Sequence, residues 1–139
     1  MRALLLIVFL SLVGCAPKAE LEDLETLNGY WVIEKVTFPD NSVKTYDIST
    51  TIDYISYKEG KGYRKKVKPS LDGIYTTSDD AIPFASVETE GAVYLRYTND
   101  SESWEEEVLM LQAKKFSVRN EDGIQYMYSR YEPLEILNE

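Results

Sequence analysis

Apolar and polar residues alternate along most of the chain from residue 29 onward, which is the period of half-buried β-strands. Val93, Leu95 and Tyr97 share one face of such a strand, whereas Arg96 faces the other way. β-Branched and aromatic residues gather in short runs bounded by Gly, Asp, Asn and Pro. We predict strands near residues 29–38, 50–58, 62–68, 73–77, 82–89, 92–98, 103–112, 115–120 and 124–131.

Short turns separate the predicted strands. Glu59-Gly60, Glu90-Gly91, Asn99-Asp100 and Asp122-Gly123 supply residues that tolerate positive φ, and no helix-length crossover separates two strands. Consecutive strands should therefore pair as antiparallel hairpins. We predict an all-β, antiparallel up-and-down meander that closes into an eight- or nine-stranded barrel, because closure removes the exposed strand edges. A β-sandwich with Greek-key connections is the alternative.

A polar, acidic segment precedes the first strand. Leu21, Leu24 and Leu27 are spaced three apart in it, with acidic residues between them. This spacing predicts a short helix with one apolar edge, and a flexible tether is the alternative.

The first residues have the layout of a secretory signal: Arg2, an apolar run from Ala3 to Leu10, and then the sequence Leu12-Val13-Gly14-Cys15. A helix over residues 3–14 would be only about 18 Å long, well short of the roughly 30 Å hydrocarbon core of a bilayer. We therefore predict a signal peptide over residues 1–14 and not a membrane span.

Residues 12–15 resemble the lipobox of bacterial lipoproteins at all four positions. The resemblance implies cleavage after Gly14, a diacylglyceryl group on Cys15 Sγ and acylation of the new amine. It divides the chain into a signal peptide (1–14), a lipidated Cys with a tether or short helix (15–27) and a barrel domain (28–139). Because Ala16 is not the Asp that retains some lipoproteins at the inner membrane, we expect an outer-membrane anchor, on the periplasmic face or the cell surface.

The two ends of the predicted barrel resemble those of lipocalins. The first strand opens with Gly29-Tyr30-Trp31, like the Gly-x-Trp motif of that family, and the last strand ends near Arg130. The resemblance implies a lipocalin-like barrel in which Trp31 closes one end and Arg130 stacks on it. The chain departs from secreted lipocalins because it lacks their disulfide cysteines, a clear Thr-Asp-Tyr motif and a long helix after the barrel.

The amino-acid composition limits the kinds of functional site that the chain can form. The formal net charge of −9 disfavours binding to nucleic acid. Without histidine, and with Cys15 as the single cysteine, the chain cannot build a His-based triad, a His-bearing zinc site or an internal disulfide. The acidic runs Asp79-Asp80 and Glu105-Glu106-Glu107 are interpreted as solvated charge, because neighbouring strand residues face opposite ways. Neither Asp79-Asp80 nor Asn99-Asp100 has the ligand spacing of a calcium site. We predict no enzyme activity, no cofactor and no metal site.

A basic segment interrupts this acidic chain. Residues 58–68 contain six basic residues and one acidic residue, Arg64, Lys65 and Lys66 among the former. The segment is interpreted either as a solvated hairpin or as a contact surface for an anionic group.

Aromatic residues are the other candidates for binding. The chain has 11 tyrosines, many of them in predicted strands, where packing alone favours them. If Tyr54, Trp104, Tyr126 and Tyr128 line a cavity, their rings and hydroxyls suit a small amphipathic ligand. An eight-stranded barrel is just wide enough to be filled by side chains or to hold one such ligand.

These features predict a non-enzymatic, lipid-anchored protein of the bacterial cell envelope that binds a small hydrophobic or amphipathic ligand. The alternative is an envelope protein–protein interaction, assembly or inhibitor module whose barrel is filled.

Overall fold

The computed structural model describes residues 18–47, 51–69, 76–77 and 80–132. The predicted signal peptide and Cys15 lie outside these residues. The described chain contains one 3₁₀-helix and ten strands. They are η1 (Leu21–Leu27), β1 (Gly29–Thr37), β2 (Val43–Thr45), β3 (Ile52–Lys58), β4 (Lys61–Lys68), β5 (Thr76–Thr77), β6 (Ile82–Thr89), β7 (Ala92–Thr98), β8 (Ser103–Leu111), β9 (Lys115–Asn120) and β10 (Gln125–Arg130).

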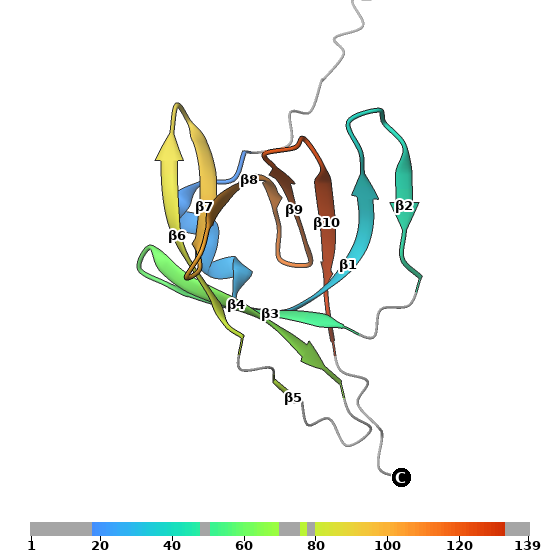
Figure 1. The fold of residues 1–139 in the computed structure, drawn as a ribbon, viewed down its shortest axis with the longest axis horizontal. Coiled ribbons are helices and arrows are strands. Elements are labelled where there is room, and N and C mark those ends of the chain that lie inside the picture. Colours follow the sequence, from blue (N-terminus) through green and yellow to red (C-terminus); the bar gives the residue numbers. More distant parts are fainter. Residues whose placement is uncertain (1–17, 48–50, 70–75, 78–79, 133–139) are drawn as a thin grey trace, which may run out of the picture.

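Eight of the strands form a closed antiparallel barrel (Figure 1). The order is β1-β3-β4-β6-β7-β8-β9-β10, and β10 pairs with β1 to close the ring. The short strands β2 and β5 pair with β1 and β4 at the edge of this ring. The predicted closed meander is therefore confirmed, and the sandwich alternative is wrong.

Strand β1 divides its pairing between two neighbours. Its first residues, Gly29 to Trp31, pair with β3, whereas Lys35 to Thr37 pair with β2. On its other side β1 pairs with β10 along most of its length, with an irregularity between Ile33 and Lys35. β1 is thus the strand that joins the start of the barrel to its end.

Two of the tight turns have the positive φ values that their sequences predict. Glu59 and Gly60 have φ values of 50° and 87°, and Glu90 and Gly91 have values of 52° and 77°. Positive φ at both central residues defines the type I′ turn, whose twist fits antiparallel strands. These turns set the register of the β3–β4 and β6–β7 hairpins.

The segment before β1 is a 3₁₀-helix that packs against the barrel, so residues 21–27 are not a flexible tether. A helix with three residues per turn places Leu21, Leu24 and Leu27 on one face. Leu24 and Leu27 are fully buried and belong to the same apolar cluster as Leu95, Phe116 and other inward side chains. η1 therefore contributes to the core, and it lies within the outline of the ring in Figure 1.

The remaining differences from the predicted elements are small. Strand β2 was not expected, because its three residues are exposed and too few to show alternation. Of the strand predicted over residues 73–77, residues 73–75 lie outside the described part of the chain and Thr76–Thr77 form β5. Among the described residues, no helix is long and apolar enough to cross a membrane.

Candidate ligand-binding cavity

A cavity of about 340 Å³ lies on the inward face of the barrel, beyond the apolar layer that packs on η1. The inward side chains of β8 pass from the cavity into the apolar core. Trp104 and Glu106 face the cavity, whereas Val108 belongs to the core. Seven strands and the residue Asp80 supply the lining. The residues are Asp53, Arg64, Lys65, Lys66, Asp80, Ile82, Tyr97, Trp104, Glu106, Asn120, Tyr126 and Tyr128.

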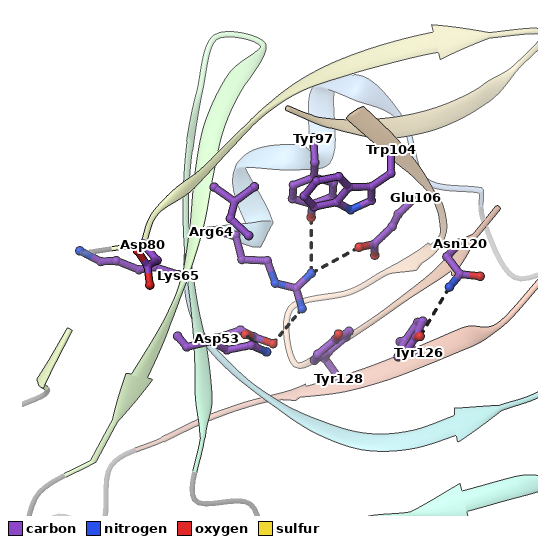
Figure 2. A pocket seen from close by; sticks show the side chains of 12 residues that line it. Asp53, Arg64, Lys65, Asp80, Tyr97, Trp104, Glu106, Asn120, Tyr126 and Tyr128 are labelled. Carbon is purple, nitrogen blue, oxygen red and sulfur yellow. Dashed lines mark hydrogen bonds and ion pairs between the residues drawn. The ribbon is translucent and has the colours of Figure 1, made fainter. Parts of the chain in front are cut away.

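Arg64 occupies the centre of the polar part of the lining (Figure 2). Its side chain is 11% exposed, and Nη2 donates a hydrogen bond of 2.8 Å to Asp53 Oδ2. Nη1 lies 3.4 Å from the Tyr97 hydroxyl and 3.9 Å from Glu106 Oε1, and the guanidinium carbon lies 4.8 Å from the centre of the Tyr128 ring. The basic segment is therefore not a fully solvated hairpin, because Arg64 faces into the barrel.

Asp53 is the main partner of this cation. It is 3% exposed, and its second oxygen lies 2.5 Å from Lys66 Nζ. Burial would raise the pKa of Asp53, but the charges of Arg64 and Lys66 outweigh burial and hold the pKa below its ordinary value. The carboxyl group is consequently ionised at neutral pH.

Glu106 has fewer close hydrogen-bond and ion-pair partners than Asp53. Its Oε2 is buried and has no hydrogen-bond partner among the described residues, while Oε1 lies 3.9 Å from Arg64. Burial raises the pKa of Glu106, and the nearby Arg64 offsets this effect only in part. Glu106 thus presents an acceptor whose hydrogen-bonding capacity the described residues do not use.

Aromatic rings form the rest of the wall. Trp104 stacks on Tyr97 (Figure 2). The ring centres are 5.4 Å apart and the ring planes differ by 11°. Burial raises the pKa of Tyr97, and burial also raises the pKa of Tyr128 to about 12. Asn120 Nδ2 lies 3.5 Å from the hydroxyl of Tyr126. These hydroxyls are neutral at physiological pH, so the wall offers flat apolar surface with uncharged polar edges.

The unsatisfied acceptor predicts that Glu106→Gln stabilises the fold. A raised pKa means that ionised Glu106 destabilises the folded state, so this cost is absent at low pH and grows as the pH rises above the ordinary value of 4.5. We expect the variant to gain about 1 kcal/mol of unfolding free energy at pH 7. Chemical denaturation at pH 4 and pH 7 measures the gain, and an equal or larger gain at pH 4 would contradict this explanation.

The opposite end of the barrel is closed by Trp31 and Arg130. The Arg130 guanidinium carbon lies 4.1 Å from the Trp31 ring centre, and Trp31 Nε1 donates a 2.8 Å hydrogen bond to the Leu27 carbonyl. A Cβ on Gly29 would lie 2.6 Å from Arg130 Nη1, and Gly29 has a φ of 126°. The Gly-x-Trp sequence therefore leaves room for the arginine that covers the tryptophan.

The structure brings together six of the seven residues predicted to contact a ligand or partner. Trp104, Tyr126, Tyr128, Arg64, Lys65 and Lys66 line the cavity. Their separation along the chain shows that strand alternation and closure of the barrel, and not a local motif, assemble the site.

Tyr54 and Lys65 lie differently from the other five predicted contact residues. Because Asp53 faces inward, alternation places Tyr54 on the outer face, where it packs 4.9 Å from Tyr30 and 6.1 Å from Tyr63. Lys65 reaches the edge of the lining, but its Nζ lies 5.6 Å from the Tyr63 ring centre and 5.9 Å from that of Tyr54. Tyr54 is therefore not part of this cavity, and Lys65 lies at its rim.

The acidic run on β8 divides between the two faces of the sheet. Glu105 and Glu107 pair with Arg96 and Arg119 at 3.2 and 2.5 Å, while Glu106 faces the cavity. Sequence reasoning missed Asp53, Tyr97 and Glu106 as site residues, although the position of Trp104 two residues before Glu106 would place both on one face. Among the described residues, no group of three or more acidic or cysteine side chains is arranged to hold a metal ion.

A closed eight-stranded meander with an N-terminal 3₁₀-helix at one end and a cavity beyond it is a lipocalin-like fold. Apocrustacyanin C2, a lipocalin-family protein, is similar in its solved structure, with a TM-score of 0.51 and 12% sequence identity over 83% of this chain and 66% of that chain. Apocrustacyanin C1 gives a TM-score of 0.49, with the same identity and coverage.

The likeness to apocrustacyanin C2 concerns the fold alone, because only 12% of the residues are identical. This chain spans slightly less than two thirds of the length of that protein. No protein-family model matches the chain, and no curated protein matches it. The class of ligand therefore has to be inferred from the residues that line the cavity.

Proposed function

We propose that this protein is a non-enzymatic binder of a small hydrophobic or amphipathic molecule, held in the barrel cavity. The observation that carries the proposal is the cavity of about 340 Å³, where Trp104 and Tyr126 face a polar cluster centred on Arg64. Ligand sites combine apolar walls with a few placed polar groups, and this volume is near the lower end of their range of about 300 to 1,000 Å³. A ligand of small size fits this description.

The proposal includes a lipid anchor in the bacterial cell envelope. Its support is the sequence Leu12-Val13-Gly14-Cys15, which matches the lipobox at every position. Two or three acyl chains on Cys15 would hold the protein durably at a membrane surface, where amphipathic molecules are concentrated. An outer-membrane anchor is the form of this proposal that Ala16 favours.

An assembly or inhibitor module with a filled barrel is less consistent with this geometry. Such a module has no need of an inward-facing cavity, whereas here Glu106 Oε2 lies beside the cavity without a hydrogen-bond partner in the part of the chain that the structure describes. The cavity therefore favours ligand binding over the filled-barrel alternative.

Binding of N-phenyl-1-naphthylamine, a neutral probe that fluoresces in apolar surroundings, tests the proposal. We expect saturable binding by the purified protein and at least tenfold weaker binding by Trp104→Ala, because Trp104 forms part of the cavity wall. Tyr63→Ala is the control, since Tyr63 is exposed on the outer face and should leave binding unchanged.

Mass spectrometry of protein purified from its own membranes provides a second test of the proposal. Its intact mass should include acyl chains at Cys15, and native mass spectrometry should detect a small molecule released by organic solvent. Failure to bind the probe, together with an empty cavity in the membrane-derived protein, would remove the ligand-binding proposal.

A further inference from the structure

We propose that the ligand of this cavity carries a hydrogen-bond donor, an amino or hydroxyl group that binds Glu106 Oε2, on a flat apolar body that packs beside Trp104. The inference rests on the proposed ligand-binding function and specifies its ligand class. It excludes simple carboxylates, such as fatty acids, as the preferred ligands.

The first support is that the buried cation of the cavity already has anionic partners. Arg64 is hydrogen-bonded to Asp53 at 2.8 Å and lies 3.9 Å from Glu106. Lys66, at the rim, is paired with the other oxygen of Asp53 at 2.5 Å. A ligand carboxylate would have to displace one of these partners or lie beside two buried carboxyl groups, and both arrangements are unfavourable.

The second support is the kind of hydrogen-bonding group that the cavity leaves unused. Among the described residues, Glu106 Oε2 is a buried acceptor without a hydrogen-bond partner. An acceptor left in this state destabilises a protein, and a donor brought by a ligand restores the missing bond. Figure 2 shows the Glu106 carboxylate between Arg64 and Asn120, within the space that the labelled side chains surround.

The third support is the aromatic surface beside this acceptor. Trp104 precedes Glu106 by two residues on β8, so both side chains leave the same face of the strand and line one cavity. Tyr126 and Tyr128, two residues apart on β10, line the cavity as well. A ligand with a donor group next to a planar ring would contact the acceptor and the aromatic wall together.

Three compounds with one phenyl body and different polar groups test the inference: 2-phenylethylamine, 2-phenylethanol and 3-phenylpropionate. Each is measured by displacement of N-phenyl-1-naphthylamine and by calorimetry. We expect the amine and the alcohol to bind at least tenfold more tightly than the carboxylate. Glu106→Gln should weaken binding of the amine about tenfold and reduce its advantage over the carboxylate, because the variant removes the negative charge but keeps the size of the side chain.

Glu105→Gln is the matched control, because Glu105 is the neighbouring residue on the outer face of β8 and pairs with Arg96. It should leave all three affinities unchanged. If the naphthylamine probe binds but the carboxylate binds as well as the amine, or neither donor compound binds, or Glu106→Gln leaves the order unchanged, the inference is wrong and the proposed function stands. If neither the probe nor any phenyl compound binds, the proposed function fails and the inference fails with it.

Discussion

Replacing Asp53 with alanine is expected to lower the free energy of unfolding by about 3 to 5 kcal/mol, the usual cost of removing one partner from a buried ion pair. The variant leaves Arg64, whose side chain is 11% exposed, with Glu106 at 3.9 Å as its nearest remaining carboxylate. It also removes the ion pair between Asp53 and Lys66, whose charged atoms lie 2.5 Å apart. Urea denaturation followed by circular dichroism measures the loss.

Two further variants distinguish the effect of losing the buried ion pair from the effect of losing side-chain volume. The double variant Asp53→Ala with Arg64→Met should recover part of the loss, because it no longer buries a guanidinium that has lost its closest carboxylate partner. Glu105→Ala, which breaks the half-exposed pair with Arg96, should cost less than about 1 kcal/mol. A loss at Asp53 as small as that at Glu105 would contradict the central role assigned to the buried pair.

The direction of the pH dependence follows from the lowered pKa of Asp53. The folded state binds the proton of this carboxyl group less tightly than the unfolded state does, so the stabilisation is present above the ordinary value of 3.8. It is lost as the pH falls through the lower pKa of the folded protein. Asp53 and Glu106 therefore affect acid stability in opposite directions, although both contact the same arginine.

Replacing Trp31 with alanine is expected to cost about 3 to 5 kcal/mol, as for other large aromatic side chains in a core. Trp31 is fully buried and packs edge-on against Phe116 at 4.6 Å, while Arg130 covers its ring at 4.1 Å. The substitution also removes the hydrogen bond to the Leu27 carbonyl, which holds the end of η1. Thermal and urea denaturation of the variant measure the effect.

The second tryptophan of the chain provides the comparison for this prediction. Trp104 is only partly buried and lines the cavity, so Trp104→Ala should weaken binding of the naphthylamine probe with a smaller loss of stability. Trp31→Ala that still folds at low temperature should retain probe binding, because Trp31 is not among the lining residues. Equal losses of stability in the two variants would contradict the division between a closed end and a binding end.

The fold was predictable because two local signals agree along most of the chain. Alternation defines strands such as β7, and Gly60 and Gly91 mark turns that join consecutive strands. Strand β2 lacks both signals, since it is three exposed residues long. The leucines spaced three apart indicated the helix, and the same spacing explains why it is 3₁₀.

The site was only half predictable, because sequence patterns do not state which face of a strand turns inward. Aromatic residues such as Trp104 and Tyr128 were expected to face a cavity or the core, and they do. Asp53 and Glu106 were missed because charged residues in strands normally face water. Only the packed barrel shows that Arg64 faces inward and lies close to both of them.

The hydrogen bonds between Arg130 and the start of the barrel affect the order in which the chain folds. Its guanidinium donates hydrogen bonds to the carbonyls of Asn28 and Thr26, residues 102 and 104 positions earlier, and the last strand closes the ring against the first. Contacts of such long sequence separation form late and slowly. Under the export and lipid anchoring proposed above, a chain that crosses a membrane with its N-terminus first would lack these closing contacts until residue 130 had emerged. It would therefore cross unfolded and close its barrel only afterwards.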